Sequence, residues 1–434
     1  MADLSFVRKD IIPERAAPLS ETGVIGWFRK NMFSDIPNTI LTIIVAYFII
    51  SVLGNILPWV FSPTWNSGSL TECRGILAEL GRSGHGGGGA CWGVIRERWL
   101  QLLFGFYPSE LYWRPILAFI LLGLALAPVL FDKASRKLLY LTAIYPFLCF
   151  WLIWGGSIWF TITVFSGFIV SYLGYVYVNK IFGSLAGVIA SIALPIIWWL
   201  FITSPLSTLL QSIIPLGSES IDSDRLGGFM LAVLIGVTGI ALSLPIGILL
   251  ALGRQSNLPI LKAVCVCFIE FIRGVPLITL LFVASTLLNI FLPPGSNFDL
   301  ILRVMIMVTL FAAAYMAEVV RGGLAALPKG QYEAADSLGL DYWKAQRLII
   351  MPQALKISIP GIVSTFIGLF KDTTLVSIIG LLDPLGLSTN IRADMAWNGI
   401  LWELYGFVGL IFFIFCFSMS RYSMYVERKL ATGH

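Results

Sequence analysis

Residues 333–352 of the chain read EAADSLGLDYWKAQRLIIMP. This polar stretch lies between two long apolar runs, at about 300–320 and 357–381. A helix needs roughly 20 apolar residues to cross a hydrocarbon core of about 30 Å. The stretch is therefore an island between two expected membrane spans, and the same pattern of apolar runs and short polar connections extends over most of the chain.

The composition also indicates a membrane protein. Of the 434 residues, 57% are hydrophobic and 12% are charged, and the mean hydropathy is +0.86. The apolar runs lack the alternation of a closed barrel, so we predict an all-α polytopic membrane protein. The net charge of +5 is too small to indicate binding of nucleic acid. The basic residues cluster beside the apolar runs, as expected for loops on the inner side of a membrane.

About ten transmembrane helices are expected, five in each half of the chain. Residues 1–38 are interpreted as a cytosolic N-terminal tail and not as a signal peptide. Residues 39–224 form an N-terminal transmembrane extension with a large periplasmic loop at 62–114, and residues 225–434 form a second block that contains a cytoplasmic connection at 328–352. An even number of spans places both termini in the cytoplasm. The spans are expected at about 39–61, 115–131, 138–155, 159–177, 182–202, 226–252, 264–292, 300–320, 357–381 and 401–420.

The outer loop contains Cys73 and Cys91, which lie on the oxidising side in this topology. A disulfide between them would close the Gly-rich turn at 84–89, but two free thiols remain an alternative. Residues 92–106 have apolar side chains at helical spacing. That helix either lies on the outer membrane surface or packs on the protein itself. No metal site is indicated.

The polar island itself predicts two short helices joined by a turn. Residues 331–338 suit a first helix and Gly339 ends it, while Asp341 can cap a second helix that Pro352 ends. The small side chains of Ala334 and Ala335 would let another protein approach the first helix closely. From the composition alone, an ordinary interfacial loop explains the island equally well.

Several motifs resemble one family of transport proteins. The island matches the signature of the permease subunits of ABC importers, with Met351 where leucine is usual, at Glu333, Ala334, Ala335, Gly339, Ile349 and Pro352. Four further segments resemble the polar amino-acid branch of that family, namely 273–277, 314–322, 328–331 and 371–377. The long N-terminal half resembles one of the two permeases of general L-amino-acid or glutamate, glutamine, aspartate and asparagine uptake systems.

This resemblance implies a five-helix type I ABC importer core in the C-terminal half, paired with a second homologous permease in a bacterial inner membrane. A dimer of ATPase subunits would grip the connection at 328–352 from the cytoplasm, and a periplasmic amino-acid-binding protein would deliver the substrate. The chain has no G-x-x-x-x-G-K-S/T phosphate loop. We therefore expect a transport subunit and not an enzyme. It would bind no cofactor, its partner would use ATP and Mg, and it would be surrounded by membrane lipid.

Polar residues inside spans are the candidates for contact with a zwitterionic amino acid, because charges are expensive there. A polar cluster interrupts the span near residue 370, and it either lines a translocation path or fixes helix packing. Its members are Lys371, Asp372, Thr373, Thr374 and Ser377.

Other charged residues lie near the ends of spans. Gating or structural ion pairs are expected at the inner ends of two spans, from Glu270, Arg273, Glu318 and Arg321. Arg303, near the outer end of a span, is expected to reach the lipid headgroups.

Two other functions compete with the ABC permease. A self-sufficient secondary transporter would use intramembrane acids for ion coupling and usually has an internal repeat, and it leaves the polar island unexplained. A membrane enzyme would need a nucleophile with a base, a metal-ligand cluster or a phosphate cradle, and none stands out in the sequence.

Overall fold

The structure is a computed structural model that describes residues 23–82, 88–287, 290 and 299–430. It forms two compact units, Met1–Gly93 and Val94–His434. Their boundary falls inside the expected outer loop at 62–114. Residues 1–22, most of the expected cytosolic tail, and residues 83–87 of the expected Gly-rich turn lie outside the described residues.

The first unit contains a long membrane-crossing helix, α2. Asp35 precedes it, and its carboxylate accepts a hydrogen bond from the Asn38 backbone N–H at 2.8 Å, which caps the helix start. No residue of α2 is buried. The helices of this unit are α1 (Gly23–Asn31), α2 (Ile36–Val60) and α3 (Leu70–Glu79).

The outer part of the first unit is held by a disulfide and by tryptophan contacts. Cys73 and Cys91 form a disulfide bond with their Cα atoms 5.9 Å apart. The Trp92 indole N–H donates to the Val60 carbonyl at 2.6 Å, and its ring stacks on Trp65 with centroids 5.6 Å apart. These links connect the segment that follows α3 back to the end of α2.

The second unit begins with α4 and continues with the apolar helices of the extension. α4 packs on the protein itself: Leu102 and Phe104 are buried, and Arg98 Nη2 lies 2.6 Å from Asp394 Oδ2. This supports the second of the two interpretations of residues 92–106. The elements of this part are α4 (Gly93–Phe104), α5 (Trp113–Leu130), α6 (Leu138–Trp154), α7 (Ile158–Phe182), α8 (Ser184–Ile197), α9 (Thr203–Ile213) and the short antiparallel strands β1 (Gly156–Ser157) and β2 (Gly217–Ser218).

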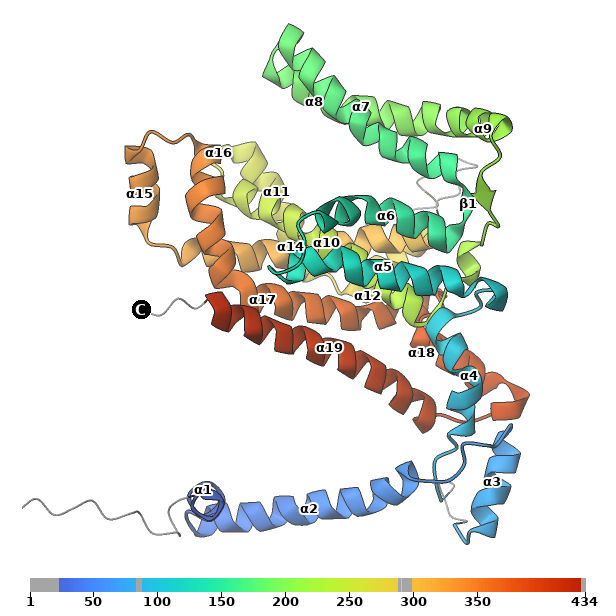
Figure 1. Ribbon diagram of the computed structural model, residues 1–434. Coiled ribbons are helices and arrows are strands. Elements are labelled where there is room, and N and C mark those ends of the chain that lie inside the picture. The colour runs from blue at the N-terminus through green and yellow to red at the C-terminus, as the bar shows by residue number, and fades with distance from the viewer. Residues whose placement is uncertain (1–22, 83–87, 288–289, 291–298, 431–434) are drawn as a thin grey trace, which may run out of the picture. The chain divides into compact units, whose positions relative to one another are not determined.

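The helices of the extension differ in how they meet the rest of the unit. α5 and α6 contribute Ala118, Cys149 and Leu152 to the same buried cluster as residues of the later helices. α7 and α8 instead form an antiparallel pair (Figure 1), in which Gly167 faces the Trp199 ring that follows α8. Within a membrane the hydrophobic effect does not drive helices together, so their association depends on close packing, which small residues allow.

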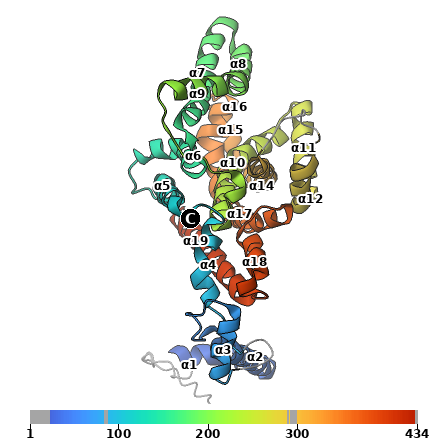
Figure 2. The same ribbon diagram turned by 90° about the vertical axis from the view of Figure 1, so that its right-hand side faces the viewer.

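The C-terminal half forms a bundle of long helices. α10 and α14 lie at its centre, and α17 and α19 run beside each other (Figures 1 and 2). Gly247 of α10 lets the Met316 side chain of α14 approach closely. The helices are α10 (Gly228–Gln255), α11 (Pro259–Gly274), α12 (Leu277–Phe282), α14 (Leu300–Ala325), α15 (Lys329–Ser337), α16 (Tyr342–Ala345), α17 (Met351–Asp372), α18 (Pro384–Ala393) and α19 (Trp402–Leu430).

The membrane-crossing helices agree with the expected pattern, with two differences. Within the described residues, eight helices are long and apolar enough to cross a membrane. The span expected at 138–155 is the shorter helix α6, with 17 residues. The span expected at 264–292 is a broken pair, Pro259–Gly274 and Leu277–Thr286, bent by 103°. The break coincides with Val275 and Pro276, because proline lacks the N–H that would continue the helix.

Arg303 does not reach toward headgroups, so that expectation was wrong. Its side chain is buried, and its Nη1 donates hydrogen bonds to the carbonyls of Ser285 at 2.8 Å and Ala284 at 3.3 Å. Both carbonyls belong to a π-helical turn, Val283–Leu287. A buried guanidinium that binds carbonyls of such a turn satisfies polar groups on both sides.

Candidate coupling and translocation site

The polar island, called the bracket here (residues 328–352), forms two helical arms. α15 ends where Gly339 adopts a φ of +68°, and the N–H groups of Gly339 and Leu340 bond back to Asp336 and Ala335. A positive φ is costly for residues other than glycine, which explains the glycine at this turn. The Asp341 carboxylate then accepts from the Lys344 backbone N–H at 3.0 Å and caps α16. This hydrogen bond and the Lys344 ammonium lower the pKa of Asp341.

The second arm of the bracket is continuous with a membrane span. Helical structure extends from Tyr342 to Ile379, so Pro352 does not end the arm as expected. The preceding turn, Gln346–Ile350, is π-helical, and the Met351 N–H bonds to the Gln346 carbonyl. This wider turn leads the helix into α17, where Pro352 lies in the first turn and its missing N–H is tolerated. Motion of the arm is therefore motion of the span.

A hydrogen bond between side chains joins the two arms. Gln353 Nε2, in the first turn of α17, donates to Gln331 Oε1 of α15 at 2.9 Å. The same amide donates to the Ile349 carbonyl at 2.9 Å. The Ile349 side chain packs on the buried cluster that includes Val320 and Leu324 of α14. These contacts make the bracket one body with the inner ends of α14 and α17.

The bracket exposes a large apolar surface, called the docking face here. Four large side chains that belong to it are exposed by 53% to 73%, namely Leu338, Tyr342, Trp343 and Leu348. Glu333, Ala334 and Pro352 are also exposed. Ala335 is buried, at 1% exposure, so it packs inside the bracket and only Ala334 of the pair is open to a partner. Exposed apolar groups on a polar loop are typical of a protein interaction site.

A charge cluster lies where α10, α11 and α14 end. Glu318 accepts from Arg321 Nε at 2.8 Å, and its other oxygen lies 3.3 Å from Arg254 and 3.6 Å from Arg273. Arg254 also contacts Glu270 Oε1 at 2.8 Å. The three guanidiniums and two carboxylates link the three helices at this end. The four residues expected to form ion pairs are thus brought together.

The polar cluster near residue 370 lies at the end of α17 and in the 3-10 turn Thr373–Ile379. The three hydroxyls of Thr373, Thr374 and Ser377 donate to carbonyls of their own chain, at 2.8, 2.8 and 2.9 Å. Thr373 is fully buried against α10, so it lines no open path in this conformation.

The two charged residues of this cluster, unlike its hydroxyls, are not paired within the described part of the chain. Lys371 is exposed, and Asp372 is partly buried. In the described part of the chain, neither side chain forms a salt bridge. Placing an unpaired charge within a membrane span costs free energy, so such a residue usually has a function.

Sequence reasoning missed three residues of this region. Arg254 joins Glu270 to Glu318, and its position in the last turn of an apolar helix was a signal that could have found it. Gln353, which joins the arms, carries no sequence signal. Asp383 is buried and caps α18 by accepting from the N–H groups of Gly386 and Leu385 at 2.8 and 3.2 Å. Burial raises the pKa of Asp383 to about 6.

The chain is similar in sequence to a known family of transport proteins. A family model described as "Binding-protein-dependent transport system inner membrane component" matches residues 243–432, which include the bracket, the charge cluster and the polar cluster. The chain is 58% identical, over 100% of both proteins, to the glutamate/glutamine/aspartate/asparagine transport system permease protein BztC of Rhodobacter capsulatus. It is 39% identical, over 97% of both proteins, to the inner membrane amino-acid ABC transporter permease protein YhdY of Escherichia coli.

A shorter relative shows that the N-terminal half is not needed in every such protein. The glutamate/aspartate import permease protein GltK of Escherichia coli is 30% identical over 212 residues, which cover 93% of that protein but 48% of this chain. The full-length matches, in contrast, include the extension. This chain belongs to the family of amino-acid ABC transporter permeases, the inner membrane components of binding-protein-dependent transport systems.

Proposed function

We propose that this chain is one of two permease subunits of an ATP-driven importer for polar L-amino acids, with glutamate, glutamine, aspartate and asparagine as the substrates. The substrate class is supported by the 58% identity over the full length of a permease named for these four amino acids. Family membership favours ATP coupling over a self-sufficient secondary transporter. Both termini lie in the cytoplasm in this proposal, on the same side as the bracket.

The observation that carries the proposal is the continuity between the docking face and a membrane span. Trp343 and Leu348 of the docking face belong to the same helical segment, Tyr342–Ile379, that crosses the membrane as α17. An ATPase subunit that grips these side chains would displace α17 directly. Closure of an ATPase dimer would thus change the equilibrium between inward-facing and outward-facing arrangements.

The partners follow from this arrangement. ATP and Mg are bound by a pair of ATPase subunits, since this chain carries no phosphate loop and acts only as a transport subunit. A second, homologous permease completes the path, and a periplasmic amino-acid-binding protein supplies the substrate. The charge cluster around Glu318 holds the inner ends of α10, α11 and α14 together in one of the two arrangements.

Lys371 is the candidate for contact with the substrate carboxylate. Its ammonium is exposed and forms no salt bridge in the described part of the chain, and it lies in a span where a charge is costly. Lys371→Met should abolish uptake while ATP hydrolysis in the reconstituted complex persists. A Lys371→Met protein that takes up substrate normally removes this residue from the path.

The docking face can be tested by the association of subunits. Leu338→Glu combined with Trp343→Glu places two charges on the docking face, and the ATPase subunit should no longer copurify while the second permease still does. Met395→Glu is the control, because Met395 is 96% exposed but lies in the 3-10 turn Met395–Trp397 after α18. Retention of the ATPase by the double variant would contradict the proposed docking.

A further inference from the structure

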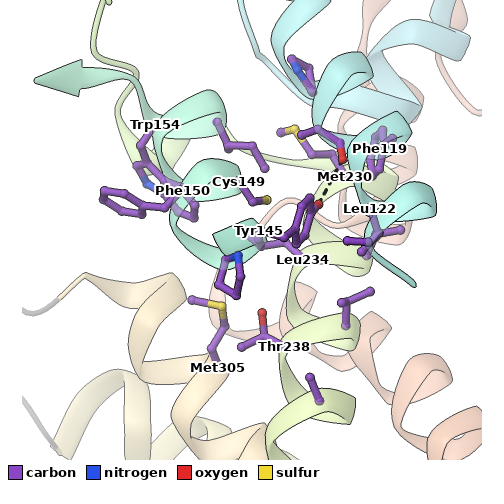
Figure 3. Close-up of a pocket in the computed structure, with 18 of the residues that line it drawn as sticks. Phe119, Leu122, Tyr145, Cys149, Phe150, Trp154, Met230, Leu234, Thr238 and Met305 are labelled. Atoms are coloured by element: carbon purple, nitrogen blue, oxygen red, sulfur yellow. Dashed lines mark hydrogen bonds between the residues drawn. The ribbon is translucent and has the colours of Figure 1, made fainter. Parts of the chain in front are cut away.

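A groove of about 590 Å³ lies between the extension and the C-terminal bundle, lined by α5, α6, α10 and α14. Figure 3 shows Phe119 and Leu122 of α5 facing Leu234 and Thr238 of α10 across it. The groove opens to the surface at Phe150 and Leu242, which line it and are 38% and 48% exposed. Its volume falls in the range of about 300 to 1,000 Å³ that is typical of small-molecule sites.

Several polar side chains that line the groove form hydrogen bonds within the protein. The Tyr145 hydroxyl donates to the Ala118 carbonyl at 3.1 Å, and the Thr142 hydroxyl donates to the Ala125 carbonyl at 2.6 Å. Figure 3 shows the Tyr145 bond crossing from α6 to α5. At the end near the start of α10, the Trp154 indole N–H donates to Ser223 Oγ at 2.8 Å. Asp299 is the one charged residue among the described residues of the lining, and its carboxylate accepts from the Leu302 backbone N–H at 3.1 Å. These lining residues include no cation that could pair with the carboxylate of an amino acid, and the rest of the walls suits an apolar chain.

The length of the groove matches one leaflet of a membrane. It extends along α5 from Pro115 to Leu126, or about 16 Å at 1.5 Å per residue. A bilayer core is about 30 Å thick. α5, α10 and α14 are all long and apolar enough to cross it. At that depth hydrocarbon surrounds the protein, so a single acyl chain is the occupant that this length and chemistry fit.

Basic residues lie where the groove ends near Thr142. The connection between α5 and α6 carries Lys133, Arg136 and Lys137, all exposed. Its one acidic residue, Asp132, is paired with Lys429 of α19.

The basic end of α19 lies beside the same connection. The Tyr422 hydroxyl donates to the Leu130 carbonyl, and Lys429 pairs with Asp132, so both ends of this part of α19 meet the end of α5 and the connection after it. Basic pockets between membrane helices on the cytoplasmic side bind anionic headgroups.

We propose that this groove holds an acyl chain of an anionic phospholipid whose phosphate lies against Lys133, Arg136 and Lys137. The lipid fills the space between α5 and α6 on one side and α10 and α14 on the other. It thereby joins the extension to the bundle that carries the bracket. This role is independent of the substrate and of ATP coupling.

The test begins with the headgroup end. The complex purified in mild detergent should retain a phosphatidylglycerol or cardiolipin molecule that native mass spectrometry detects. Replacing all three cations, Lys133→Gln, Arg136→Gln and Lys137→Gln, should weaken phosphatidylglycerol binding by roughly a hundredfold, since each cation contributes about a factor of five near an anionic surface. The control removes three other exposed cations, Arg29, Lys180 and Lys262, and should retain the lipid.

The groove itself is tested by filling it. Thr238→Phe with Ala241→Phe places two rings in the groove and should remove the bound lipid, whereas Ala263→Phe on the exposed side of α11 should not. A photo-reactive benzophenone side chain in place of Thr238 should become cross-linked to lipid in native membranes. Unchanged lipid in both the filled and the charge-depleted variants, or cross-linking to another polypeptide, would overturn the proposal.

Discussion

Two helices of nearly equal length and similar apolar character differ in how much of each is buried. α2 has 25 residues and α14 has 26, and both can cross a membrane. No residue of α2 is buried, whereas 56% of the most apolar stretch of α14 is buried. The buried side of α14 combines larger apolar residues with small ones such as Ala313, Ala314 and Ala317, whereas α2 is rich in isoleucine. Apolar character thus specifies a span, and small residues help a span to pack closely on other helices.

The largest difference between α14 and α2 is expected when a glycine of each helix is replaced by a larger residue. A Cβ at Gly323 of α14 would lie 2.5 Å from the Ala354 carbonyl oxygen of α17, whereas a Cβ at Gly54 of α2 would have no atom within 4 Å. Gly323→Val should destabilise the protein by about 3 kcal/mol or more, because overpacked backbone cannot relax. Gly54→Val should leave the thermal unfolding midpoint in detergent unchanged. Equal effects at both glycines would refute the distinction.

A large effect is also expected at the disulfide, but only in the first unit. Cys73 and Cys91 enclose a segment with a sequence separation of 18. Loss of a crosslink over a loop of about this size costs about 3 kcal/mol. Cys73→Ser with Cys91→Ser should make residues 62–93 sensitive to limited proteolysis in membranes, while the bundle around α14 stays resistant. The control is Cys267→Ser, an exposed free cysteine. Proteolysis that spreads into the bundle would show that the two units do not unfold separately.

A moderate effect should separate two glutamates of the charge cluster. The Glu318 side chain is 24% exposed and meets three guanidiniums, whereas the Glu270 side chain is 53% exposed and meets one. Glu318→Gln should cost about 1 to 2 kcal/mol, between the values for buried and exposed pairs, and Glu270→Gln less than about 1 kcal/mol. Thermal unfolding of the two variants measures the difference. A larger effect at Glu270 would contradict the central position of Glu318.

The smallest effect is expected at the exposed contact between the α5–α6 connection and α19. A hydrogen bond from Lys429 lowers the pKa of Asp132. A carboxyl group whose pKa is lower in the folded state stabilises the protein above its unfolded-state pKa, near 3.9. This stabilisation is lost as the pH falls through the folded-state pKa. Because the Asp132 side chain is 78% exposed, solvent screens the pair. Asp132→Asn should therefore leave the unfolding midpoint unchanged at pH 7, and a clear decrease there would show that this contact is stronger than its exposure indicates.

The sequence predicted the features whose causes are local. The turn at Gly339, the cap at Asp341 and the apolar runs each follow from neighbouring residues, and the structure has all three. The role of Pro352 was wrongly predicted, because the π-helical turn that carries the helix past the proline depends on packing around it. The position of Arg303 was missed for the same reason, since the carbonyls that it binds belong to a π-helical turn 18 to 19 residues earlier in the chain.

The candidate site shows the same limit. The sequence identified Glu270, Arg273, Glu318 and Arg321 as charged residues near span ends, but their convergence on Glu318 depends on how three helices pack. The polar cluster near Lys371 was expected either to line a path or to fix helix packing, and in the structure its three hydroxyls bond to their own backbone. The packing of helices that are distant in sequence decides which side chains meet. No short sequence pattern predicts that packing.

The central claim is that energy enters this chain through the bracket. It is tested most directly by measuring uptake and ATP hydrolysis in the same proteoliposomes, with the complete complex carrying Gly339→Val. A β-branched residue at a φ of +68° should distort the turn at a cost of about 1 to 2 kcal/mol. Gly330→Val is the control, since Gly330 lies within α15 and a Cβ there has no atom within 4 Å. The account predicts that Gly339→Val hydrolyses ATP but takes up at least tenfold less amino acid per ATP than the control; an unchanged ratio would contradict it.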